Sequence, residues 1–385
     1  MVVIRLELKD PPVIGVSSSG QTIRLGGFSG LRFLGRSHLG HFRFVTHTDR
    51  GPNTDEEDRP KGTTRPFGVP NFQPRLVYLE GDPKQKTLMV TRQLPLMQKH
   101  GSPISGLPPG ADNEIAVDFK GRNLGADENG LDLEGVTFAT DGSFWMAEEY
   151  GPSLVHFSLG GRMIDRFMPG KELPETFRYR RLNRGFEGVS LSGNKLFGLL
   201  ESPLDNPPSP KQANSVKSRI TRMVEVDIAR RITTGQYAYV MEEANTGRLS
   251  DMTMADEHNF LVLERGRTDG KDWRRIYRAG IFGATNLQRL SSQITGPGGT
   301  LESLAPAELA KNGIVPMKKE LLFDLGGLGL KEEKPEGIDK VGDEWIAVII
   351  DNDFELSGGL DHENAVGVTK DEPAAIYLIK LEQSQ

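Results

Sequence analysis

Acidic residues recur at matching places in the sequence, where short apolar segments begin. Three of them precede a glycine, in LEGVTF, FEGVSL and PEGIDK, and a fourth lies in the looser segment SDMTMA. These residues are Glu134, Glu187, Glu336 and Asp251. Carboxylate oxygens, with neither cysteine nor histidine at the same positions, favour a hard cation. We expect the four residues to bind calcium, with magnesium or manganese less favoured.

A second set of acidic residues follows the next apolar segment in each copy. Its members are Asp49, Glu148, Glu149, Glu201, Glu264, Asp351 and Asp353. If the two segments are antiparallel strands, the second set returns to the end where the first set begins. A carboxylate there that holds no metal can accept a proton from an attacking water, and we assign this role to Glu149 and Glu201. The other five residues, with Arg50 and Arg265, are expected to contact the substrate.

A structural role is the alternative for each of these acids. Acids at strand ends often accept hydrogen bonds from backbone amides and from arginines of a neighbouring repeat, and such exposed ion pairs add little stability. No basic residue recurs at positions matching the first set, however. Like charges gathered there would need a bound cation, a partner or protonation.

The positions of these acids follow an internal repeat. Five segments begin near residues 28, 133, 186, 250 and 335, and each consists of a strand, a turn and a second, more apolar strand. Two further strand-like runs follow several copies, such as RLVYLE and TLMVTRQL, LVHFSL and MIDRFM, and RMVEVDI and YAYVME. Four strands per copy is the size of a propeller blade. The fold class predicted is therefore an all-β protein, a β-propeller of four-stranded blades.

The chain ends supply the strand that the last copy lacks. That copy is followed only by AAIYLIKL, so its fourth strand is expected to be the N-terminal VVIRLELK, which would close the ring. Five copies are counted, and a sixth blade stays open. We expect one propeller domain over residues 1–385, with long loops at 51–72, 101–130, 203–217 and 291–317. These are either ordinary loops or the rim of the active face.

Composition excludes several classes of protein. The net charge of −6 argues against a nucleic-acid partner, and zero cysteines exclude disulfides and thiolate sites. No apolar stretch reaches the length of a membrane span, and the N-terminus lacks the apolar run of a secretory signal. We expect a monomer without a membrane span. It is either cytoplasmic, or periplasmic or extracellular after removal of a signal.

Common catalytic motifs are absent from the sequence. There is no G-x-S-x-G, whose nearest matches are GVSSSG and GPSLV, and no H-E-x-x-H or phosphate-binding G-x-x-x-x-G-K-[ST]. A serine-triad mechanism of the α/β-hydrolase kind is therefore not expected.

The ordered motifs resemble those of the phytase-like esterase domain family. They include GGFSGL, THTDRGP, LEGVTFATDGSFWMAEEYGPSLVHF, RGFEGVSLSGNKLFGLLESPL, FLVLERG and KPEGID followed by DNDF. The resemblance covers nearly the whole chain and implies an exported propeller with esterase, phosphodiesterase or phytase-like hydrolase activity. Thr48 stands where the family often has an acid, so only Asp49 of that pair is present. The EG pairs are also similar to the metal-binding strand of gluconolactonase-type propellers.

These observations predict a calcium-dependent hydrolase of phosphate or carboxylate esters. A small-molecule ester would bind at the acidic face, where the ion polarises it and an acidic side chain accepts a proton. The alternative is a non-catalytic propeller that binds a ligand or protein and holds calcium for structure alone.

Overall fold

The computed structural model describes residues 2–59, 62–110, 114–290, 294–295, 298–356 and 358–381. The chain forms two compact units. The first comprises Met1–Glu134, Phe157–Ile164 and Lys334–Gln385, and the second comprises Gly135–His156 and Asp165–Glu333. In the described residues no helix is long and apolar enough to cross a membrane.

The first unit contains an eight-stranded sheet in the order β23-β24-β27-β1-β9-β8-β5-β4. The strands are β1 (Val3–Leu8), β4 (Phe28–Arg36), β5 (Phe42–Thr48), β8 (Arg75–Asp82), β9 (Thr87–Pro95), β23 (Pro335–Val341), β24 (Trp345–Ile350) and β27 (Ala375–Lys380). The first and last copies of the repeat thus each contribute four strands. Their outermost strands, β1 and β9, pair in parallel.

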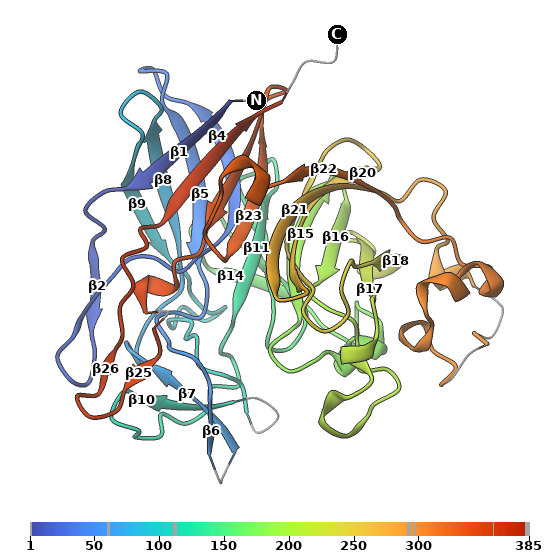
Figure 1. Cartoon of the computed structure of the whole chain (residues 1–385), viewed down its shortest axis with the longest axis horizontal. Coiled ribbons are helices and arrows are strands. Elements are labelled where there is room, and N and C mark those ends of the chain that lie inside the picture. The colour runs from blue at the N-terminus through green and yellow to red at the C-terminus, as the bar shows by residue number, and fades with distance from the viewer. Residues whose placement is uncertain are drawn as a thin grey trace. The chain divides into compact units, whose positions relative to one another are not determined.

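The chain ends meet within this sheet as predicted. Strand β1 pairs antiparallel with β27, with Val3 opposite Ile379 and Glu7 opposite Ala375. In Figure 1 the blue β1 runs alongside a red strand from the end of the chain. The N-terminal strand therefore completes the last copy.

In the described residues three smaller sheets accompany the four-stranded repeats, and one of them lies in two segments that we expected to be irregular loops. Strands β6 (Glu57–Arg59), β7 (Gly62–Phe67) and β10 (Ile115–Asp118) form a sheet in the order β10-β7-β6. Two short pairs are β2 (Val13–Val16) with β3 (Thr22–Arg24), and β25 (Leu360–Asp361) with β26 (Val366–Gly367). Segments 51–72 and 101–130 are therefore partly strand, although residues 60–61 and 111–113 lie outside the described part.

Three more four-stranded sheets follow in sequence order. They are β11 (Leu133–Phe138), β12 (Phe144–Glu148), β13 (Ser153–Phe157) and β14 (Met163–Phe167); β15 (Phe186–Ser192), β16 (Lys195–Leu200), β17 (Ile220–Asp227) and β18 (Ile232–Val240); and β19 (Arg248–Met254), β20 (Asn259–Thr268), β21 (Lys271–Gly280) and β22 (Lys318–Asp324). The predicted class, an all-β protein of four-stranded propeller blades, is confirmed. The single domain and the number of blades stay predictions.

Short 3-10 helices occupy the connections. They are η1 (Glu175–Tyr179), η2 (Pro210–Gln212), η3 (Ser215–Lys217), η4 (Leu287–Arg289), η5 (Leu301–Ser303), η6 (Pro306–Glu308), η7 (Ala310–Asn312), η8 (Gly326–Leu328) and η9 (Asp353–Glu355). The described part of 291–317 is packed, because Leu301, Leu304 and Ile314 join Ile220 of β17 in one apolar cluster. Residues 291–293 and 296–297 lie outside the described part.

The second strand of each repeat is buried almost throughout, as its apolar sequence predicts. Every residue of β12 is buried, as are all residues but the first of β16 and of β24. In the first unit Leu31, Phe44 and Ile349 belong to one core, and in the second unit Phe186 and Leu200 belong to another. Each such side chain contributes about 1.5–3 kcal/mol by leaving water. These cores hold the strand ends that carry the acids.

Candidate functional site

A β-bulge accounts for the acid-glycine pairs. In the β15–β16 ladder Phe186 faces Leu200 and Gly188 faces Leu199, so Glu187 is the extra residue. Glu336 is the extra residue in the same way between Pro335 and Gly337. A bulge releases one residue from the ladder and redirects its side chain.

The glycine after each bulge is required by a close backbone approach. A Cβ atom on Gly188 would lie 2.8 Å from the Met252 nitrogen, and one on Gly337 would lie 2.6 Å from the Gly30 carbonyl carbon. Both distances are too short for any other residue without movement of the neighbouring strand. The motif thus combines a released acid with a tight contact between inner strands.

Asp251 does not occupy the position of these glutamates in its hairpin, so the predicted equivalence was wrong, whereas its role as a metal ligand stays a prediction. In the β19–β20 ladder Leu249 faces Glu264 and Asp251 faces Leu263, which makes Ser250 the extra residue. Asp251 stands where the other copies have glycine, and its Oδ1 atom accepts a 2.7 Å hydrogen bond from the Met252 nitrogen. The alignment of this repeat with the other copies, made from the sequence, was therefore one residue out of register.

Three glutamates of the second unit form a compact group, the glutamate trio of Glu149, Glu187 and Glu201. Glu149 comes directly after the last residue of β12, and Glu201 follows β16. One carboxylate oxygen from each lies within 4.8 Å of the others, and all three residues are buried. This spacing suits ligation of one cation by three side chains.

Glu201 has one engaged and one unengaged oxygen. Its Oε1 atom accepts a hydrogen bond from Arg184 at 3.0 Å and lies 3.2 Å from the Arg248 Nε atom. Its Oε2 atom is buried and has no hydrogen-bond partner among the described residues. A buried carboxylate oxygen without a partner is costly, and a bound cation would remove that cost.

Four arginines of the second unit interact electrostatically with one another, and three of them, Arg181, Arg184 and Arg248, also interact with Glu201. Burial lowers the pKa of Arg181 to about 10, and the charge of Arg184 lowers it further. Burial also lowers the pKa of Arg248 to about 10, where Glu201 opposes the effect and Arg184, Arg265 and Arg181 add to it. These four residues, the arginine group, create a positive potential that favours an anionic ligand.

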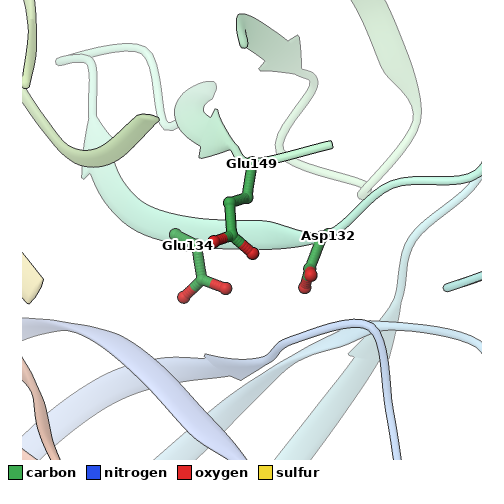
Figure 2. A group of neighbouring side chains, drawn as sticks. All are labelled: Asp132, Glu134 and Glu149. Atoms are coloured by element: carbon green, nitrogen blue, oxygen red, sulfur yellow. The ribbon is translucent and has the colours of Figure 1, made fainter. Parts of the chain in front are cut away.

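The first unit contains a separate concentration of acids. Asp132 and Glu134, two residues apart, point to the same side of the chain in Figure 2. Burial raises the pKa of Glu134 well above its usual value, and the charges of Asp132, Asp49 and Glu336 raise it further. Burial and neighbouring acids likewise raise the pKa of Asp49 to about 8.

The same group extends to the last copy of the repeat. Burial, followed by the charges of Asp353, Asp49 and Glu336, raises the pKa of Asp351 well above its usual value. Two cations contact this group: Arg50 lies 3.1 Å from Asp132, and Lys334 lies 2.6 Å from Asp353. The predicted residues Asp49, Glu134, Glu336, Asp351 and Asp353 are thus brought together.

Glu148 and Glu264 have internal partners instead of a place in a ligand site. Glu148 is fully buried and accepts hydrogen bonds from the Tyr150 nitrogen and from Arg166. Glu264, also fully buried, accepts them from Tyr239 and from Lys319 at 2.6 Å. These contacts support a structural role for both residues, and their predicted contact with a substrate stays a prediction.

The family can now be stated from a comparison with known proteins. The model of the phytase-like family, described as the esterase-like activity of phytase, matches residues 23–354. The chain belongs to this family. The predicted family membership is confirmed.

Relatives and structures similar to this phytase-like protein are distant. An uncharacterized secreted protein of Arthroderma benhamiae is 28% identical over 221 residues, which cover 46% of this chain and 42% of that protein. The chain therefore spans less than half the length of this relative.

Among solved structures, the catalytic domain of a Coprinopsis cinerea GH62 α-L-arabinofuranosidase is 12% identical, with a TM-score of 0.38 and coverage of 98% and 96% of the two chains. The calcium-binding protein regucalcin from Agrobacterium tumefaciens is 11% identical, with a TM-score of 0.33 and coverage of 86% and 92%. These likenesses concern the fold alone.

Sequence reasoning did not place Asp132 or most of the arginine group among the site residues of this phytase-like protein. Asp132 lies two residues before Glu134, and alternation along a strand could have placed both on one side. Arg184 lies three residues before Glu187, in RGFEG, but its partner Glu201 belongs to the next strand. Only the folded hairpin brings such pairs together.

Proposed function

We propose that this protein is a metal-dependent hydrolase of phosphate or carboxylate esters. The observation that carries the proposal is the glutamate trio beside the arginine group in the second unit. Membership of the phytase-like family supports hydrolysis as the reaction class. A cation site next to guanidinium groups is suited to an ester whose reacting group is negatively charged.

The trio fits a hard cation, of which calcium is our first choice. All donors are carboxylate oxygens, and the Oε2 atom of Glu201 has no hydrogen-bond partner among the described residues. We assign Glu187 and Glu201 as the side chains that hold the ion. When bound, such an ion polarises the ester oxygen and lowers the pKa of a bound water.

Glu149 is the proposed general base. Glu201 was an equal candidate from the sequence, but its Oε1 atom is engaged by Arg184 and Arg248. Glu149 would take the proton from the attacking water, and Arg184 would keep Glu201 in place.

The acids of the first unit are proposed to hold a further ion. Glu134 and Glu336 keep their predicted ligand role, since burial and neighbouring acids disfavour the charged form of Glu134 unless a cation is present. Asp251 is left out of the ligand set because its Oδ1 atom already accepts the Met252 amide. Asp49, Arg50, Asp351 and Asp353 stay proposed substrate contacts.

We also propose that the protein acts outside the cytoplasm as a monomer. Export is supported by the relative that is described as a secreted protein. Cell fractionation tests the location, and size-exclusion chromatography with light scattering tests the monomer.

The test of the function is a panel of phosphomonoesters, phosphodiesters, lactones and aryl esters, assayed with calcium and with EDTA. Hydrolysis of at least one class that disappears in EDTA and returns with calcium is the expected result. If no substrate is turned over while a ligand still binds, the protein is a binding protein with structural calcium. If hydrolysis is equal in EDTA, the proposed metal dependence is wrong.

A further inference from the structure

Arg248, which contacts Glu201, also lines a pocket of about 300 Å³ in the second unit. Arg265 and Arg267 of β20 line the same pocket, together with Asn245 and Thr246 of the loop before β19. Three guanidinium groups therefore share a single concave site. Of these three arginines, the sequence predicted a substrate contact only for Arg265.

The three guanidinium groups are held in position by the protein. Arg248 donates to the backbone oxygens of Asn245 and Gly247, at 3.1 and 3.0 Å. The Nε atom of Arg265 donates to the Ser250 hydroxyl at 3.2 Å, and that of Arg267 donates to Asp272 at 2.6 Å. Groups ordered before binding lose less entropy when a ligand arrives.

The loop that carries the uncharged part of the lining is also fixed. The Thr246 hydroxyl donates to the backbone oxygen of Arg267 at 2.7 Å and accepts its amide at 3.3 Å. The loop that carries Asn245 and Thr246 is thus held against β20 by two hydrogen bonds. Asp272 and Glu333 also line it, which leaves one more positive than negative side chain in the lining.

The lining and the volume together define a ligand class. Arginine forks match the planar or tetrahedral oxygens of carboxylate, sulfate and phosphate, with paired hydrogen bonds. A volume of about 300 Å³ lies at the lower end of the range for ligand pockets, so the ligand is small. Burial, followed by the charges of neighbouring arginines that include Arg265, lowers the pKa of Arg248, and a bound anion would offset both effects.

We propose that this pocket binds the oxyanion group of the substrate, so that the enzyme selects small esters that carry a phosphate, sulfate or carboxylate group. The proposal rests on the proposed function and assigns a place to the substrate. Arg248 connects the glutamate trio with the pocket, because it contacts Glu201 and lines the pocket. Arg265 and Arg267 then decide which anions are accepted.

The test measures binding of inorganic phosphate by calorimetry at constant ionic strength, with sulfate and acetate as further arms that rank the three oxyanions. Arg265→Gln should weaken binding of the preferred anion by about 10- to 100-fold, the effect of losing charge-assisted hydrogen bonds. Arg265→Lys keeps the charge but loses the paired hydrogen bonds of the guanidinium group, so its anion affinity should lie between those of the wild type and Arg265→Gln. This variant also covers the case in which Arg265→Gln does not fold.

The matched control is Arg278→Gln. Arg278 belongs to β21, is partly exposed and pairs with Asp256 outside the pocket. Its loss should leave anion binding unchanged. Equal binding by Arg265→Gln and Arg278→Gln, or no binding of any of the three anions by the wild type, would overturn the proposal.

Failure of this inference differs from failure of the proposed function. Anion binding is measured without turnover, so a calcium-dependent esterase that binds no anion in this pocket refutes the pocket alone. A protein that binds phosphate through Arg265 but hydrolyses no ester refutes the function alone.

Discussion

Replacement of Glu201 by glutamine has two opposing electrostatic effects in the unliganded protein. At an effective dielectric constant of about 20, charges 4.8 Å apart repel by about 3.5 kcal/mol, and Glu201 has two such neighbours in the trio. Its contacts with Arg184 and Arg248, at 3.0 and 3.2 Å, are each worth about 5 kcal/mol on the same scale. Because 4.8 Å is the upper bound on these separations, attraction exceeds repulsion by at most about 3 kcal/mol. We expect Glu201→Gln to lower the free energy of unfolding in EDTA by up to this amount, as for other broken buried pairs.

The same replacement should remove most of the stabilisation by calcium. In the wild type, calcium at about 100 times its dissociation constant should raise the free energy of unfolding by about 2.7 kcal/mol if one site is filled in the native state only. Glu201→Gln removes one charge from the ligand set, so its gain should be much smaller. Urea unfolding in EDTA and in calcium, followed by tryptophan fluorescence, measures both quantities.

Glu302→Gln is the matched control for this experiment. Glu302 is buried and pairs with Arg222, but it does not belong to either group of acids. This variant should lose stability in EDTA and keep the full gain with calcium. If Glu201→Gln keeps the same calcium gain as Glu302→Gln, the assignment of Glu201 as a ligand is wrong.

Three further predictions follow from named contacts. Glu149→Gln should lower turnover by about 10² to 10⁴-fold while calcium still raises the unfolding free energy, and unchanged turnover in a steady-state assay would exclude it as the base. In EDTA, the raised pKa of folded-state acids such as Asp49, about 8, should make the free energy of unfolding greatest at low pH and reduce it as the pH rises towards 8. Calcium should diminish this loss. Urea unfolding at about pH 5 and pH 8 checks the sign. Gly188→Ala should cost about 1–3 kcal/mol, because its Cβ would lie 2.8 Å from the Met252 nitrogen, and an unchanged melting temperature would contradict the close approach.

The strands of the repeat could be predicted because each carries its own pattern. The apolar second strands and the missing fourth strand of the last copy were sufficient to expect the β1–β27 pair. The β10–β7–β6 sheet could not be predicted in the same way. Strands β7 and β10 are parallel and far apart in the sequence, and β6 is only three residues long.

The candidate site could be predicted only where one hairpin defines it. Glu187 and Glu201 come from the two strands of a single hairpin, and the sequence placed both near the same end. The role of Glu264 depends on Lys319, which belongs to a strand two places further along the sheet, and no local pattern shows that contact. Asp251 was misaligned because the bulge in its hairpin lies one residue away from the expected position, and the sequence alone does not reveal where a bulge lies.

The most direct measurement is the location of the cation in a crystal of the protein grown with calcium, with manganese as an anomalous stand-in. We predict an ion bound by carboxylate oxygens of Glu187 and Glu201, next to Glu149, with calcium–oxygen distances of about 2.3–2.6 Å. The Oε2 atom of Glu201 should be one of its ligands. A saturated crystal with no ion at Glu149, Glu187 and Glu201, or with an arginine of the group filling the space between them, would contradict the account.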